Sequence, residues 1–413
     1  MLGVSRRSVV LVLGAILLLS LNLRPAAVSV GPVLDELRAG LDMGPASAGL
    51  LTSLPVLSFA IFGALAPSVA RRLGPHRVTL LALLAVVVGL SARAAVRQEG
   101  AFLALSLLAT AGMAMANVLI PSLVRLHFPD RIGLVTGLYT TALAVGLTAA
   151  FLLTVPVADA LGGWRYGIGV WAVLAAVAAV PWIGLVRRDE ALVAPARDIG
   201  FGDIARTRLG WAMTLFFGLQ SLMAYAVFGW FATLWRDAGF GAGTASALVG
   251  IVAAMSIPLS RVLPQAVARP GDRRGVLVAV MACYPIAYLG LLIAPQALAV
   301  LWAVVLGAAL TTFPIVLTYI GLRTRTAGAT AALSGWTQST GYLLAVIGPF
   351  GIGVAHEATD GWTVPLVGLL VLSVPLFLVG MYVGRPAHIE DEFARRERRI
   401  DQSSDAPPPL GTT

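Results

Sequence analysis

The sequence predicts an all-α membrane protein whose twelve transmembrane helices form two pseudo-symmetric six-helix bundles. Of the 413 residues, 58% are hydrophobic and only 12% are charged, whereas about one quarter of the residues in soluble domains are charged. A helix needs about 20 apolar residues to cross the hydrocarbon core of a bilayer, and the chain contains twelve stretches of this kind. The longest interior polar stretch, residues 187–209, leaves six of them on either side.

The expected spans follow from long apolar runs that are bounded by charges, glycines and prolines. Two neighbouring spans are separated only by Ala294-Pro295. The twelve expected spans are 9–34, 46–70, 78–96, 101–124, 133–158, 165–186, 210–234, 243–266, 275–294, 296–320, 331–355 and 362–384.

The basic residues indicate how these spans are oriented. All 29 of them are arginines, and the net charge is +9. With a cytoplasmic N-terminus, most arginines fall in loops on the cytoplasmic side, as the positive-inside rule requires. We therefore expect a multi-pass protein of the cell inner membrane with both termini in the cytoplasm. Because this rule accounts for the charge, the bilayer is the expected partner, and no nucleic-acid partner is expected.

The two halves of the chain look like diverged copies. Ala66-Pro67 before span three matches Leu263-Pro264 before span nine, at an offset of 197 residues. Two such halves place a substrate near the midplane, at the interface between the repeats. We expect a monomer. The predicted organisation is an N-terminal bundle at 1–186, a cytoplasmic central loop at 187–209, a C-terminal bundle at 210–384, and a partly disordered cytoplasmic tail at 385–413.

Several classes of chemistry are not expected. The single cysteine, Cys283, excludes a disulfide framework and a cysteine-based metal site. The four histidines fall in loops, span ends or the tail without metal-ligand spacing, and we expect them to be solvated: His76, His127, His356 and His388. No nucleotide-binding, hydrolase or redox motif is present. We therefore expect no metal, no cofactor and no enzymatic activity.

Polar side chains are distributed unevenly among the spans. Spans three, six, nine and twelve consist almost entirely of Leu, Val, Ala and Gly. The candidate polar residues lie in other spans. Lipid-facing helices must be apolar, whereas helices that line a cavity need not be. The third helix of each triplet is therefore expected to face lipid.

Arg24 is the main candidate for contact with a substrate. It lies about fifteen residues into the first span, and an arginine at the centre of a membrane helix costs about 2.5–3.5 kcal/mol on insertion scales. All twenty carboxylates fall in loops, span ends or the tail, so an anionic substrate is a suitable partner. The alternative is a structural anchor that binds backbone carbonyls freed near Pro25.

Seven further polar residues complete the candidate substrate-binding set. Gln338 and Tyr342 share one helix face because they are four residues apart, and Tyr225 follows Gln220 on span seven. For each residue, hydrogen bonding between helices is an open alternative. The set is Asn22, Asn117, Tyr139, Gln220, Tyr225, Gln338 and Tyr342.

Protons or a counter-solute could drive transport. Asp35 and Glu36 at a span end are candidates for handling the proton.

The pattern resembles the major facilitator superfamily and, within it, the cyanate permease and 2-nitroimidazole transporter family. The resemblance is carried by Asn22-Leu23-Arg24-Pro25, Phe128-Pro129-Asp130-Arg131, Gly218-Leu219-Gln220-Ser221 and Gly341-Tyr342. It implies a secondary active or facilitative transporter of a small anionic or compact polar solute that works by alternating access. The chain departs from the superfamily at Arg71, where an acidic residue is usual. This departure puts the customary charged latch between the halves in doubt.

Two other functions remain open. The first is a multidrug or metabolite efflux exporter of the same fold, although exporters of cations favour an acidic residue in the membrane. The second is a membrane sensor that does not transport. It would need a signalling domain, and the central loop and tail contain no recognisable one.

Overall fold

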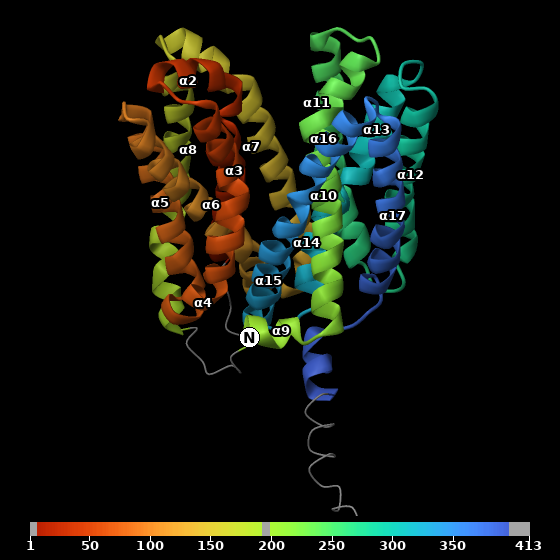
Figure 1. Ribbon diagram of the computed structural model, residues 1–413. Coiled ribbons are helices and arrows are strands. Elements are labelled where there is room, and N and C mark those ends of the chain that lie inside the picture. The colour runs from red at the N-terminus through yellow and green to blue at the C-terminus, as the bar shows by residue number, and fades with distance from the viewer. Residues whose placement is uncertain (1–5, 192–198, 396–413) are drawn as a thin grey trace, which may run out of the picture.

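The computed structural model describes residues 6–191 and 199–395. Within them the chain is helical, and Figure 1 shows two groups of helices side by side. The first half comprises α1 (Arg6–Val28), α2 (Leu34–Leu41), α3 (Pro45–Ser58), α4 (Ala64–Leu73), α5 (Pro75–Ala95), α6 (Glu99–His127), α7 (Ile132–Leu161) and α8 (Trp164–Leu185). Short helical segments join them at η1 (Gly31–Val33), η2 (Phe59–Gly63), η3 (Pro129–Arg131) and η4 (Val186–Ala191).

The second half begins with a short helix of the central loop, α9 (Phe201–Ala205). It continues with α10 (Arg208–Asp237), α11 (Ala242–Ala268), α12 (Arg274–Ile293), α13 (Ala299–Leu310), α14 (Thr312–Leu322), α15 (Ala327–Ala345), α16 (Ile347–Thr359) and α17 (Thr363–Val383). Twelve helices of the described part are long and apolar enough to span a membrane, which confirms the fold class. The two expected spans that only Ala294-Pro295 separates are two helices, because α12 ends at Ile293 and α13 begins at Ala299.

Two of the spans are interrupted near their middle. The tenth span changes from α13 to α14 at Thr311, and the eleventh changes from α15 to α16 at Val346. The second span contains the π-helical segment η2. Such wide turns are frequent at functional sites, and here each interruption lies in a span that was not assigned to the lipid-facing set.

The four almost purely apolar spans occupy the periphery. Helices α5 and α8 pack within the first half, and α12 and α17 pack within the second. Large aliphatic side chains on these helices remain exposed, among them Val173 and Ile183 on α8 and Val371 and Leu378 on α17. This placement agrees with the expectation that the third helix of each triplet faces lipid.

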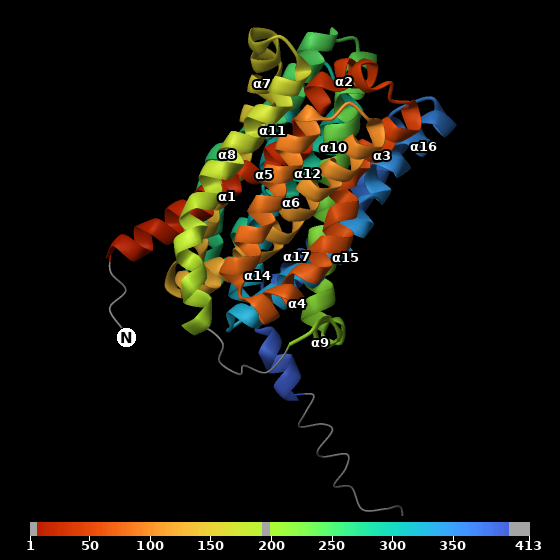
Figure 2. The ribbon, with the colours of Figure 1, turned by 90° about the vertical axis from the view of Figure 1, so that its left-hand side faces the viewer.

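The two halves touch at one end of the molecule. We call it the arginine-rich end, because it carries the arginine pairs of the loops, α4 and α9. Helix α7 meets α11 there, where a Cβ on Gly137 would lie 3.0 Å from the carbonyl oxygen of Ser260. The segment η2 and helices α4 and α6 meet α15. In Figure 1 the two groups diverge toward the opposite end, whereas in Figure 2 they overlap along the line of sight.

The tail forms a short helix at residues 389–395 and lies at the arginine-rich end (Figure 1). Its acidic side chains accept hydrogen bonds from groups of the second half. Glu392 accepts hydrogen bonds from the backbone N–H groups of Arg208 (2.8 Å) and Leu209 (3.2 Å) at the start of α10. A hydrogen bond from the Arg325 side chain to Asp391 holds the pKa of that carboxyl below its usual value. Residues 396–413 lie outside the described residues.

The expectation that the histidines are solvated is wrong for His76. Its side chain is fully buried. Its Nδ1 lies 2.6 Å from a carboxylate oxygen of Asp189, and its Nε2 lies 2.8 Å from Nε2 of His127. Asp189 also accepts a hydrogen bond from the backbone N–H of Arg77, at 2.8 Å. The histidine is buried because the start of the central loop folds back and caps α5.

Helices α1 and α7 approach closely at Gly146. A Cβ on this residue would collide with the carbonyl oxygen of Leu21, so any larger residue must push apart the helix that carries Arg24 and the helix that carries Tyr139. We predict that Gly146→Ala lowers the free energy of unfolding by about 1–3 kcal/mol. A lower apparent Tm of the purified protein in detergent would show this effect.

Gly184→Ala is the matched control. Gly184 is a glycine of α8 with open space where its Cβ would lie, and alanine has the higher helix propensity. The control should therefore leave the apparent Tm unchanged or raise it slightly. Equal behaviour of the two variants would show that the contact between α1 and α7 tolerates the extra methyl group.

Candidate functional site

Arg24 lies near the end of α1 and is only partly buried. Its guanidinium carbon is 5.5 Å from the ring centre of Phe313, on the first turn of α14 after the break at Thr311. The hydroxyl groups of Tyr225 and Tyr342 lie near enough to feel the charge of the guanidinium. No carboxylate of the described residues pairs with it. The positive charge is therefore solvated by neutral groups and remains uncompensated.

Aromatic rings surround Tyr342 on three sides. The ring centre of Phe59, at the start of η2, is 4.4 Å away. Phe217 of α10 meets Tyr342 edge-on at 5.0 Å, and Tyr225 lies 6.2 Å away. Phe217 also contacts Phe313, at 6.2 Å. Together with Arg24 these five residues form what we call the Arg24 cluster, which combines one cation with flat apolar walls.

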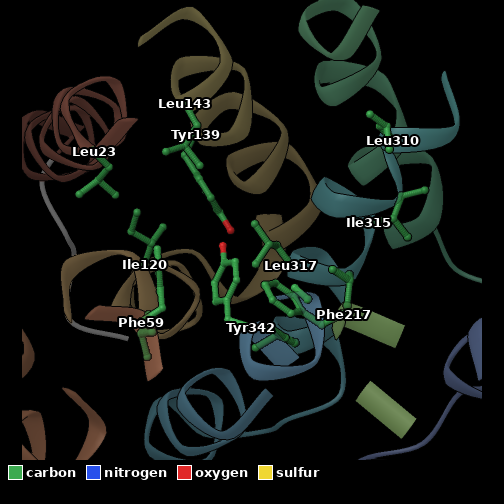
Figure 3. Packing of buried hydrophobic residues seen from close by; sticks show 14 of the residues in the cluster. Leu23, Phe59, Ile120, Tyr139, Leu143, Phe217, Leu310, Ile315, Leu317 and Tyr342 are labelled. Atoms are coloured by element: carbon green, nitrogen blue, oxygen red, sulfur yellow. The ribbon is translucent and has the colours of Figure 1, made fainter. Parts of the chain in front are cut away.

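Tyr139 reaches the same region from α7. Its side chain is 1% exposed, and its hydroxyl has no hydrogen-bond partner. Figure 3 shows Tyr139 and Tyr342 pointing toward one another from opposite halves of the molecule. A buried hydroxyl without a partner carries a desolvation penalty of about 1–3 kcal/mol, so this group is available to a ligand.

Gln220 of α10 is buried and keeps one atom free. Its Nε2 donates to the Ser221 hydroxyl at 2.6 Å, whereas its Oε1 has no partner. Gln220 therefore keeps an unbonded carbonyl oxygen on the helix that carries Phe217 and Tyr225.

Asn117 and Gln338 form a direct bond between the halves. The Asn117 amide donates to Oε1 of Gln338 at 2.8 Å, and Nε2 of Gln338 donates to the Ser334 hydroxyl at 2.8 Å. The Ser334 hydroxyl in turn donates to the carbonyl oxygen of Val118 on α6, at 2.7 Å. These polar groups satisfy one another, so the structure assigns them to the contact between the halves.

Further hydrogen bonds join the halves on the side of the Arg24 cluster where Asn117 and Gln338 lie. Ser339 donates to the carbonyl oxygen of Phe59 at 3.0 Å, which the wide turn of η2 leaves accessible. Ser122 donates to the carbonyl oxygen of Ala327 at 2.7 Å. The guanidinium of Arg125 also donates to the carbonyl oxygen of Arg325, at 3.2 and 3.3 Å. The arginine-rich end is therefore closed by several hydrogen bonds to backbone carbonyls.

Asn22 is the predicted site residue that lies apart from the others. It is fully buried, and its amide donates to the carbonyl oxygen of Trp171 on α8 at 3.3 Å. It thus points away from the partners of Arg24, two residues further along the chain. This geometry favours the alternative in which Asn22 joins two helices of one half.

Sequence reasoning missed the apolar walls of the cluster and two buried cations, Arg93 and Arg323. Phe59, Phe217 and Phe313 lie within a few residues of polar groups in the same spans, a signal that a search for polar side chains alone passes over. Arg93 is 1% exposed and donates to the carbonyl oxygen of Ala26 and the hydroxyl of Ser29. It anchors the end of α1.

The chemistry of the cluster suits binding rather than catalysis. One guanidinium and the phenol hydroxyls can donate several hydrogen bonds to one small group, and the rings can stack on a flat one. Within the described ranges, no group of three or more His, Cys, Asp or Glu residues could hold a metal ion.

Twelve spans in two groups, with polar and aromatic groups where they meet, define a membrane transporter. The sequence profile of the Major Facilitator Superfamily matches residues 10–349, and the chain belongs to this non-enzymatic family of transporters. Its fold is that of a solved proton:xylose symporter, XylE, with a TM-score of 0.71 at 12% identity over 91% of this chain and 94% of the symporter.

Three curated relatives place the chain more narrowly. It is 35% identical to an uncharacterized transporter of Bacillus subtilis, YycB, over 91% of this chain and 93% of the relative. It is 31% identical to the 2-nitroimidazole transporter of Escherichia coli, over 94% and 98%. It is 25% identical to the cyanate transport protein CynX of Escherichia coli, over 87% and 95%. The predicted resemblance to the cyanate and nitroimidazole transporters is confirmed.

The bond between Asn117 and Gln338 should favour the state in which the arginine-rich end is closed. Asn117→Ala leaves a buried amide of Gln338 without its partner, which costs about 1–3 kcal/mol. Spin labels at Arg72→Cys and Gly328→Cys, in a Cys283→Ser background, report the distance between the halves at this end. We predict that Asn117→Ala increases the population at longer distances.

Asn22→Ala is the control for this measurement. It removes an amide of the same kind from the same half, but that amide bonds to Trp171 within the half. The control should leave the distance distribution as it is in the wild type. If Asn117→Ala also left it unchanged, the bond would have no part in holding the halves together.

Proposed function

We propose that this protein carries a small anionic or compact polar solute across the inner membrane by alternating access, with Arg24 as the charge partner of the substrate. The observation that carries the proposal is the guanidinium of Arg24, which lies within a span and has no carboxylate partner among the described residues. An anion would supply the missing charge. The named solutes of the relatives, 2-nitroimidazole and cyanate, are small enough for such a site.

The surroundings of Arg24 restrict the class of solute further. Phe313, Phe59 and Phe217 offer flat apolar surfaces, and the hydroxyls of Tyr139, Tyr225 and Tyr342 offer polar groups at their edges. A planar solute with an electron-rich edge can meet both kinds of group at once. We therefore propose a cyanate-like anion or a nitro-heterocycle as the class of substrate.

The proposed binding set follows the geometry. Arg24, Tyr225 and Tyr342 make the primary contacts, with Tyr139 and Gln220 as further polar contacts. Asn117 and Gln338 close the site on the arginine-rich side and reach a solute only when their mutual bond opens. We propose that this end faces the cytoplasm and that the structure represents the state open to the other side.

The proposal is tested by binding of cyanate and of 2-nitroimidazole to the purified protein, measured by calorimetry. Arg24→Ala removes charged hydrogen bonds worth about 1.5–3 kcal/mol, so we predict that binding weakens roughly ten- to hundred-fold. Arg24→Lys should recover little of the loss, because an ammonium group lacks the planar fork of guanidinium.

Arg72→Ala is the matched control, since it removes an arginine from the exposed end of α4. It should bind both solutes as the wild type does. Wild-type affinity in both Arg24 variants would contradict the charge role, and efflux of cationic dyes without any need for Arg24 would favour the exporter instead.

A further inference from the structure

A groove lies on the outer surface, apart from the Arg24 cluster. It has a volume of about 490 Å³ and lies between the first turns of α10 and the last turns of α17, beside α9. Its lining residues are Ala205, Arg206, Thr207, Arg208, Trp211, Ala212, Leu215, Leu378, Val379 and Tyr382. We call it the α10/α17 groove. None of these residues belongs to the proposed substrate site.

The groove has a cationic end and an apolar body. Arg206 and Arg208 are exposed, and neither guanidinium has an ion-pair partner among the described residues. The nearby carboxylate of Glu392 is bound to backbone N–H groups at the start of α10. It reduces the positive potential without pairing with either guanidinium. The remaining charge lies at the arginine-rich end.

The apolar body runs from the cationic end toward the middle of the spans. Leu378 is 63% exposed and Leu215 is 40% exposed. The small side chain of Ala212 leaves room between them. Trp211 and Tyr382 border the groove where the helices begin and end, and aromatic residues of this kind are typical of the boundary between membrane and water.

We propose that the α10/α17 groove binds an anionic phospholipid. The phosphate group lies against Arg206 and Arg208, and an acyl chain lies along Leu215 and Leu378. Basic pockets between membrane helices bind anionic lipid headgroups in this way. The occupant is a lipid rather than free phosphate, because most of the lining is apolar.

The groove adjoins the closed end of the protein through a chain of rings. Trp211 meets Trp336 of α15 edge-on at 5.4 Å, and Trp336 meets Phe201 of α9 edge-on at 5.8 Å. A Cβ on Gly335 would lie 2.5 Å from the ring of Pro67 on α4 and 3.0 Å from Phe201. A lipid against Trp211 therefore supports the packing that joins α15 to the first half.

The experiment compares phosphatidylglycerol with phosphatidylcholine as additives to the full-length protein in detergent. Binding is measured by native mass spectrometry and by the shift in apparent Tm. We expect the wild type to prefer phosphatidylglycerol. In the double variant Arg206→Gln/Arg208→Gln this preference should fall roughly five-fold for each arginine removed.

Arg269→Gln/Arg273→Gln is the control with the same change in charge. Both arginines are exposed at the same end of the protein but lie outside the groove, so the preference should remain. Equal loss in both double variants would overturn the proposal in favour of general attraction to a basic surface. Equal binding of the two lipids by the wild type would also overturn it.

Two further measurements test the acyl-chain contact without altering the arginines. Inorganic phosphate and glycerol 3-phosphate should give no stabilisation; if they reproduce the lipid effect, the site binds phosphate and not lipid. Phosphatidylglycerol with brominated acyl chains should quench the fluorescence of the wild type more than that of Trp211→Phe. The same fractional quenching in both proteins would place the lipid elsewhere.

Discussion

The hydrogen bond between Asn117 and Gln338 joins the two halves through a pair of buried side chains. It joins residues 221 positions apart in the sequence, and both side chains are at least 95% buried. In a medium of low dielectric constant such a bond is strong while it is made, and each amide is costly when left alone. A pair of this kind favours two arrangements of the helices that carry it, bonded together or separated far enough for water to reach both amides. Alternating access needs two discrete arrangements of this kind.

Neutral groups around Arg24 stabilise its positive charge without a carboxylate. A carboxylate beside the guanidinium would neutralise it and would occupy the place of an anionic ligand. Neutral hydroxyls and the face of Phe313 stabilise the cation through dipoles and a cation–π contact, and they leave its net charge in place. The partial exposure of Arg24 lowers the desolvation cost further. Arg24 therefore keeps its net charge within the span, which is what its proposed role as charge partner requires.

Much of the fold could be predicted from the sequence because a bilayer tolerates few alternatives. Each span must satisfy its own backbone groups, so long apolar runs identified all twelve. The site was harder to predict. Pairings such as Asn117 with Gln338, or His76 with Asp189, depend on how distant helices pack, and no local pattern encodes them. The interruptions at Thr311 and Val346 do have a local signal, because each lies three residues before a proline, Pro314 or Pro349. A proline cannot donate a hydrogen bond to the carbonyl four residues earlier, and here that carbonyl belongs to the last residue of the preceding helix. The aromatic walls were missed because a phenylalanine in an apolar span can face either lipid or the interior. Nothing in the local sequence separates Phe59, Phe217 and Phe313 from lipid-facing residues.

Arg71, at the position where an acidic residue is usual, takes part in the contacts at the arginine-rich end. Arg71 donates to the Ser68 hydroxyl at 3.2 Å and to the carbonyl oxygen of Ile199 in the central loop at 3.4 Å. The ring of Pro67 and the ring of Phe201 both abut Gly335 of α15, where only a glycine leaves enough space. The contact at this end thus includes packed rings and hydrogen bonds to backbone carbonyls. The packing of Phe201 against Gly335 holds α9 against α15. It also makes the central loop, through α9, a structural part of the contact between the halves as well as a connection between them.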